Sequence, residues 1–177
     1  MNVVRLNQPI SCNEETDIPR FLCWMKGDFV RKNFNFWQRW LLVVSWSIVL
    51  FGLAMALLNT TPIFDLMNDR VNPVFWGDGP IPNASALFMQ WIYGVLGATV
   101  AGWGVFMVYI TRYPFYRKER WARDAMVVGL LLWYVVDTSI TLYFKVAFNA
   151  ALNTTLLIMG MLPIVMTWKA FIKEPGD

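Results

Sequence analysis

Four long runs of apolar residues divide the 177-residue chain, and shorter polar or charged segments separate them. The first run is free of charge from Trp40 to Leu58. A helix of this length, at about 1.5 Å per residue, crosses a hydrocarbon layer of about 30 Å. The other runs lie within residues 84–111, 125–144 and 146–168. The pattern predicts membrane-spanning helices over residues 40–58, 87–110, 125–144 and 151–170.

The runs predict helices rather than strands. They are continuous and rich in Leu, Ala and Met, whereas strands of a membrane barrel alternate apolar and polar residues. Backbone polar groups in hydrocarbon must bond within the protein, and a helix satisfies them inside one segment. We therefore expect an all-α, polytopic membrane protein. It has an N-terminal segment over 1–38, a four-transmembrane-helix bundle over 39–172 and a cytoplasmic tail over 173–177.

The N-terminal segment has the periodicity of a surface helix. From Ile18 to Phe29, apolar residues recur at helical spacing and basic residues occupy much of the remaining face. This pattern is typical of an amphipathic, interfacial helix on the inner membrane surface; docking to a partner protein is the alternative. The segment also holds Cys12 and Cys23, which we expect to be reduced thiols in the cytoplasm.

The amino-acid composition excludes further classes of function. Apolar residues make up 57% of the chain and charged residues 15%, against about 25% charged residues in soluble domains. The sequence contains no histidine, which removes the commonest metal ligand and any Ser-His-Asp or Cys-His catalytic unit. We therefore expect no enzyme activity, no metal, no cofactor and no nucleic-acid partner.

Lysine and arginine predict the orientation in the membrane. Thirteen of the 15 lie before the first run, between the second and third runs, or after the fourth. Because positive residues stay on the cytoplasmic side, we expect an inner (plasma) membrane protein with both termini cytoplasmic. The second connection is the most basic, and its residues are positive-inside anchors or, alternatively, bind anionic lipid head groups: Arg112, Arg117, Lys118, Arg120 and Arg123.

The first connection, residues 59–86, is expected to face outward. Its sequence NPVFWGDGPIP, residues 72–82, is rich in Pro and Gly and predicts turns. Phe75 and Trp76 within it are expected to dip into the membrane interface.

Asp137 is the one acidic residue within the predicted spans. Placing an Asp near the membrane midplane costs roughly 2.5–3.5 kcal/mol, so it should face other helices. Thr141 follows four residues later on the same helix face. The expected topology places further polar side chains in the same outer half, which predicts an intramembrane cluster of Asp137, Thr138, Thr141, Tyr93, Gln90, Asn149 and Asn153.

Three roles for Asp137 remain open at this stage. It fixes the register of neighbouring helices through hydrogen bonds, couples to a proton or cation, or recognises a polar ligand from the outer side. The structural role is favoured, because proton pathways usually need a chain of ionisable groups and this sequence offers one carboxylate and no histidine within its spans.

Small residues in the second span predict close helix packing. Gly94, Ala98 and Gly102 recur at four-residue spacing, and small residues on one face let two helices approach closely. Packing inside the monomer is favoured over dimerisation. In the fourth span, Pro163 predicts a kink.

Residues 86–165 resemble small, uncharacterised bacterial integral membrane proteins of four helices. The resemblance rests on the Gly-Trp-Gly at 102–104, the Pro-Phe at 114–115 before the basic connection, the Trp-x-x-x-Asp-Thr at 133–138, and the paired asparagines 149 and 153. It implies a bacterial inner membrane and brings no activity with it.

These observations favour a non-catalytic accessory or scaffold subunit that packs within a larger membrane protein complex, with the lipid bilayer and other membrane subunits as its partners. The alternative is a small transporter or channel-like protein with a buried polar site around Asp137. An intramembrane enzyme is the least favoured, because no nucleophile–base pair or metal-ligand set is visible.

Overall fold

The computed structural model describes residues 20–77 and 79–172, with side-chain surroundings from residue 33 onward. These residues form five α-helices joined by short 3₁₀ and π turns, and they contain no β-strand. Four of the helices are long and apolar enough to cross a membrane, so the expected all-α bundle of a multi-pass membrane protein is confirmed. They are α1 (Arg20–Leu57), α3 (Asn83–Ile110), α4 (Arg120–Tyr143) and α5 (Ala147–Thr167).

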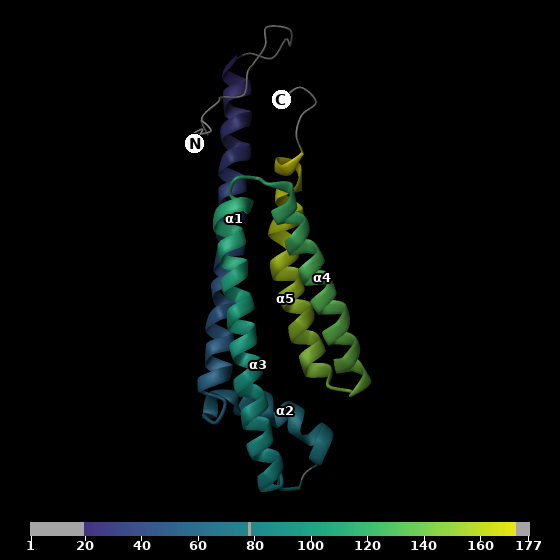
Figure 1. Cartoon of the computed structure of the whole chain (residues 1–177). Coiled ribbons are helices and arrows are strands. Elements are labelled where there is room, and N and C mark those ends of the chain that lie inside the picture. The colour runs from purple at the N-terminus through teal and green to yellow at the C-terminus, as the bar shows by residue number, and fades with distance from the viewer. Residues whose placement is uncertain (1–19, 78, 173–177) are drawn as a thin grey trace.

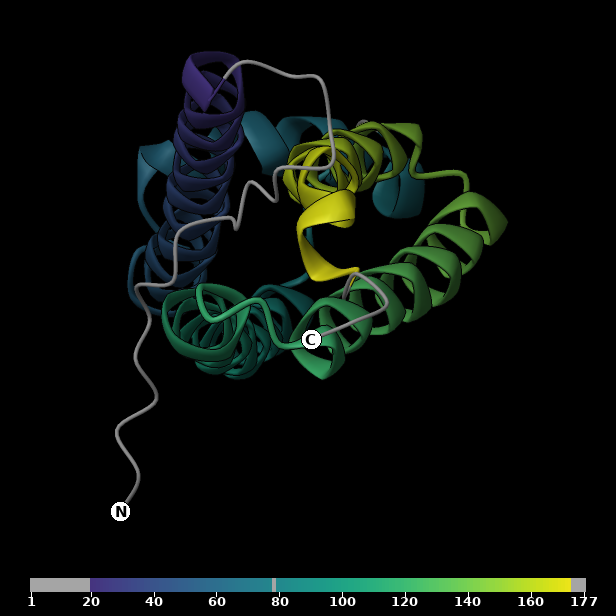
Figure 2. The same cartoon turned by 90° about the horizontal axis from the view of Figure 1, so that it is seen from above.

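The four long helices form two antiparallel pairs. α1 packs along α3, α4 packs along α5, and α1 also contacts α5 (Figures 1 and 2). The connection between α3 and α4, residues 111–119, lies at the same end of the bundle as the end of α5, and we call this the basic end (Figure 1). The short helix α2 (Asp65–Trp76) and the turn between α4 and α5 lie at the opposite end, the turn end.

An aromatic cluster fills the space between the helices at the basic end. Phe34 of α1, Phe115 of the π turn η2 (Thr111–Phe115) and Phe171 of the 3₁₀ turn η3 (Trp168–Phe171) lie with ring centroids 4.8–6.1 Å apart. All three rings are buried. Seen from above, η3 turns inward between the long helices (Figure 2), which is how its ring reaches the other two.

α1 and α3 meet through glycine backbones. A Cβ atom added at Gly97 would lie 2.5 Å from the backbone nitrogen of Ala56 and 2.6 Å from the carbonyl oxygen of Gly52. A Cβ atom at Gly104 would lie 2.8 Å from the nitrogen of Val49. No side chain fits in so little space, so glycine at these positions sets how closely the two helices approach.

The expected packing stripe of Gly94, Ala98 and Gly102 is therefore wrong in its register around α3. Ala98 is exposed, a Cβ at Gly102 would meet open space, and a Cβ at Gly94 would lie 3.9 Å from the Ala56 carbonyl oxygen, at the edge of the contact. The packed face belongs instead to a second set of small residues interleaved with the first: Gly97, Ala101 and Gly104.

Side chains of α1 also bond to the backbone of other helices near prolines. Pro163 lies inside α5 and has no N–H to give to the carbonyl of Met159, four residues before it. The indole Nε1 of Trp40 donates to that carbonyl over 3.2 Å. In the π turn that contains Pro114, the Thr111 carbonyl accepts from Nε2 of Gln38, also over 3.2 Å.

α1 is longer than its span. It has 38 residues, or about 57 Å at 1.5 Å per residue, and the spanning part is Asn33–Leu57. The helix expected before the first span is thus continuous with it, and it follows the direction of the span beyond the other helices (Figure 1). Its side chains, Cys12, Cys23 and the tail 173–177 lie outside what the structure describes.

Two further elements differ from expectation. Residues 72–76, expected to be in turns, form the last turn of α2, which accommodates Pro73 and ends at Gly77 with a positive φ of 61°. α5 begins at Ala147, four residues before the expected start, and its first turns contain polar side chains that bond to α4.

Candidate polar site between helices α4 and α5

Asp137 of α4 is the centre of a hydrogen-bonded cluster of polar side chains. Its Oδ1 atom accepts from Nδ2 of Asn153 over 2.7 Å and from Nδ2 of Asn149 over 3.3 Å, both on α5. Thr141, one turn further along α4, donates from Oγ1 over 3.2 Å. Asn149 also donates to Oγ1 of Thr141 over 2.9 Å, and Asn153 to Oγ1 of Thr138 over 3.4 Å.

Helical spacing places these groups opposite one another. Asn149 and Asn153 are four residues apart on α5, and Asp137 and Thr141 are four apart on α4, so each pair shares one helix face. The short turn after Tyr143 makes α4 and α5 antiparallel neighbours. Asn153 and Thr141 are buried, and Asp137, Thr138 and Asn149 are partly buried.

Tyr134 extends this contact and was missed by the sequence analysis. Its hydroxyl lies 3.2 Å from Oγ1 of Thr154 on α5. The signal was present, because Tyr134 precedes Asp137 by three residues and Thr138 by four, and therefore lies on the same face of α4.

Asp137 lies nearer the turn end of α4 than its basic end. Because α4 begins at Arg120 and ends at Tyr143, Asp137 is 17 residues from one end and six from the other. These separations are about 26 Å and 9 Å along the helix axis.

The chemistry of the cluster is that of one carboxylate held by neutral donors. Asp137 forms no ion pair within the described part of the chain. Among those same residues, no group of three or more His, Cys, Asp or Glu side chains could hold a metal ion. The donors are amides and hydroxyls from α4 and α5 alone, so the bonds hold the two helices in one register.

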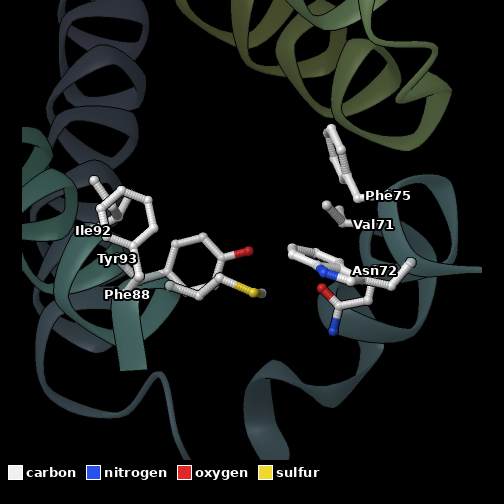
Figure 3. Close-up of a pocket in the computed structure, with 8 residues that line it drawn as sticks. Val71, Asn72, Phe75, Phe88, Ile92 and Tyr93 are labelled. Carbon is white, nitrogen blue, oxygen red and sulfur yellow. The ribbon is translucent and has the colours of Figure 1, made fainter. Parts of the chain in front are cut away.

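Gln90 and Tyr93 are not part of this cluster. Gln90 is exposed on α3, and its backbone carbonyl accepts from Nδ2 of Asn59 over 3.3 Å. Tyr93, also on α3, lines a separate cavity of about 190 Å³ between α2 and α3 at the turn end, the α2–α3 cavity (Figure 3). The other lining residues are Val71, Asn72, Phe75, Trp76, Phe88, Met89 and Ile92.

The five basic residues of the second connection have different surroundings. Three contact protein groups of α1, η3 or α4. Nε of Arg120 donates to the Phe171 carbonyl over 2.9 Å, the Arg123 guanidinium lies 4.0 Å from the Trp168 ring centroid and bonds to Asp124, and Lys118 Nζ lies 5.3 Å from the Phe34 ring centroid. Arg117 pairs with Glu119 over 3.6 Å, and Arg112 lies beside the Tyr113 ring.

The fold and the Asp137 cluster together define a multi-pass α-helical membrane protein with one carboxylate bonded inside a helical hairpin. No protein-family model, curated protein or solved structure matches the chain.

Proposed function

We propose that the chain is a non-catalytic subunit that packs through its membrane-spanning helices within a larger membrane protein complex. The observation that carries the proposal is the exposed small-residue face of α3, formed by Ala98 and Gly102, which α1 does not cover. Ala98 is exposed and a Cβ at Gly102 would meet nothing within 4 Å. Small residues let another helix approach closely, as Gly97 already does for α1.

The position of Asp137 supports the same function. Within the described residues, all of its hydrogen bonds come from the α4–α5 hairpin. Neither the α2–α3 cavity nor a smaller cavity of about 120 Å³ beside Arg112 is lined by Asp137. A carboxylate used in this way fixes the register of two helices.

The complex belongs to the inner membrane, and the basic end faces the cytoplasm. The support is the distribution of charge, because the five cations of the second connection lie at the end where α5 finishes. Anionic lipid head groups are the expected neighbours of Arg112 and Arg117, which are exposed at this end.

The test compares two glycines that both face open space. Gly102→Leu places a bulky side chain on the exposed small-residue face of α3, whereas Gly129→Leu adds the same side chain to α4. The native chain, solubilised in a mild detergent, should migrate in native electrophoresis well above a detergent-bound 20.5 kDa monomer. Gly102→Leu should release the monomer and Gly129→Leu should not. A native chain that migrates as a lone monomer would contradict the proposal.

A small transporter is the second candidate, and one feature of Asp137 favours it. Every hydrogen bond that Asp137 accepts within the described residues goes to Oδ1, which leaves Oδ2 for a proton or cation. This function predicts that Asp137→Asn abolishes flux in reconstituted vesicles. Flux equal to that of the parent chain eliminates it.

A further inference from the structure

Two arginines mark the same boundary of the apolar runs, one on each helix of the α1–α3 pair. Arg39 directly precedes the first charge-free run, and Arg112 is the first charged residue after the second run. Antiparallel packing brings them to one depth, because Nε2 of Gln38, next to Arg39, donates to the carbonyl of Thr111, next to Arg112. Lipid head groups begin where the hydrocarbon ends, so both arginines lie at the depth of lipid phosphates.

A small cavity of about 120 Å³ adjoins Arg112 on the outer side of this helix pair. It is lined by Trp46 of α1 and by Val105, Val108, Tyr109, Arg112 and Tyr113 of α3 and η2. Trp46, Tyr109 and Tyr113 are 48%, 59% and 46% exposed, so the cavity is open to the surroundings of the bundle. Arg39 precedes Trp46 by seven residues and therefore lies on the same face of α1. We call the cavity together with Arg39 the α1–α3 groove.

The two arginines of the groove have no acidic partner in the protein. Both are exposed, and neither forms an ion pair within the described residues. The three further arginines of the second connection do bond to protein groups: Arg117 to Glu119, Arg120 to the Phe171 carbonyl and Arg123 to Asp124. The groove therefore holds two cations of one sign at one depth, which favours an anionic occupant.

The remaining lining of the groove suits a lipid better than a free anion. The Tyr109 and Tyr113 rings stack with centroids 5.8 Å apart, and tyrosine and tryptophan are the aromatic residues typical of the head-group level. A tyrosine hydroxyl can donate to a phosphate oxygen. Trp46 and Val105, deeper along the helices, offer an apolar surface that a free phosphate would not use and that an acyl chain would cover.

We propose that the α1–α3 groove binds one phospholipid with a net negative head group, its phosphate at Arg39 and Arg112 and its acyl chain against Trp46 and Val105. A zwitterionic lipid carries a cation of its own, which the two arginines repel. The inference rests on the proposed function in one respect, since that function already places anionic head groups near the basic end. It adds a defined site, to which α1 contributes Arg39 and Trp46.

The experiment titrates the purified full chain, in a mild detergent, with dioleoyl phosphatidylglycerol and counts bound lipids by native mass spectrometry. Dioleoyl phosphatidylcholine has the same acyl chains and the same phosphate but carries a choline cation, so it is the matched probe. We expect the first phosphatidylglycerol to bind at least about fivefold more tightly than the first phosphatidylcholine, the effect of about one cation. Inorganic phosphate should not displace it.

Three variants locate the binding. Arg39→Gln and Arg112→Gln should each weaken binding of the first phosphatidylglycerol about fivefold, with a smaller effect on phosphatidylcholine. Lys169→Gln is the matched control, because it removes one exposed cation at the same end, on η3 rather than beside the groove. It should change the affinity for neither lipid. All three side chains are exposed, so circular dichroism should show native helix content in each variant.

Three results would overturn the proposal. Equal affinity for the two lipids would remove the preference for negative charge. A loss in Lys169→Gln equal to that in the arginine variants, or no loss in either arginine variant, would reduce the effect to a general attraction to the basic end. Displacement by inorganic phosphate would make the groove a site for a free anion. Migration of the native chain tests the proposed function separately, so failure of one is distinguishable from failure of the other.

Discussion

Asp137 is a carboxylate whose Oδ1 atom is bonded by neutral neighbours, without an opposite charge. Three neutral donors, from Asn149, Asn153 and Thr141, converge on its Oδ1 atom. Hydrogen bonds between membrane helices average only about 0.6 kcal/mol each. Their value here is therefore in fixing which residues of α4 and α5 face one another, more than in overall stability.

Two substitutions of Asp137 should distinguish the effect on stability of losing its charge from that of losing its hydrogen-bond acceptor. Asn keeps a carbonyl oxygen in the position of Oδ1, so Asp137→Asn should change the free energy of unfolding by less than about 1 kcal/mol. Asp137→Leu leaves the amides of Asn149 and Asn153 only the Thr141 and Thr138 hydroxyls as acceptors. It should cost about 1–2 kcal/mol. Unfolding in mild detergent, followed by circular dichroism, measures both.

Thr155→Val is the control for this pair, because Thr155 is exposed and bonds only to the Ala151 carbonyl of its own helix. It should unfold like the native chain. Equal stability of Asp137→Leu and Asp137→Asn would show that the cluster does not hold the hairpin together.

Part of the Asp137 cluster follows from the sequence alone. Four-residue spacing on two consecutive helices joined by a short turn places Asn149 and Asn153 opposite Asp137. Gln90 and Tyr93 were grouped with them because all lie in the same half of the bundle. Residues at the same depth in the bundle need not face one another, because depth does not determine how α3 is rotated about its own axis. That rotation directs Tyr93 to the α2–α3 cavity.

At the scale of elements, the α1–α3 pair depends on backbone contact. Gly97→Ala should cost about 1–3 kcal/mol of unfolding free energy, because the new Cβ would overlap the backbone of Ala56 and force the helices apart. Gly102→Ala meets nothing and should stabilise the isolated chain by up to about 1 kcal/mol through helix propensity. The same unfolding measurement compares them, and a greater loss at Gly102 would contradict the assigned register.

A second element-scale prediction concerns the bond between α1 and α5. Trp40→Phe keeps the aromatic ring but removes the N–H that reaches the Met159 carbonyl, and it should lower stability by about 1 kcal/mol. Trp46→Phe is the control, because Trp46 is exposed on the same helix and its indole forms no such bond in the described residues. If both variants lost the same stability, the hydrogen bond from Trp40 to the Met159 carbonyl would not contribute to holding α1 against α5.

The apolar runs predicted the four long helices because hydrocarbon allows little other structure. They did not predict where helices end in polar sequence. α5 begins at Ala147 because Asn149 and Asn153 are satisfied by α4, so polarity there does not mark the end of a helix. α2 lies outside the apolar runs, and its Pro73 was interpreted as a turn residue although the helix continues to Trp76.

At the scale of the whole molecule, the two helix pairs expose apolar side chains on most sides. Phe106 and Val128, for example, are 70% and 63% exposed within the chain. Lipid or other subunits must cover such surfaces in a membrane. The sequence indicates that these residues are apolar, but apolar character alone does not distinguish contact with lipid from contact with protein.

The central claim is that the chain crosses the membrane four times with its basic end inside. Cysteine labelling in intact cells tests it, in chains where Cys12 and Cys23 are replaced by Ser. Single cysteines are placed at Gly79 between α2 and α3, at Tyr116 in the basic connection and at Val128 on the exposed face of α4. The reagent is a maleimide that does not cross membranes.

We expect Gly79→Cys to react in intact cells and Tyr116→Cys to react only after the cells are permeabilised. Val128→Cys should react in neither state, because hydrocarbon surrounds it. Reaction of Tyr116→Cys from outside, or ready reaction of Val128→Cys, would contradict the account.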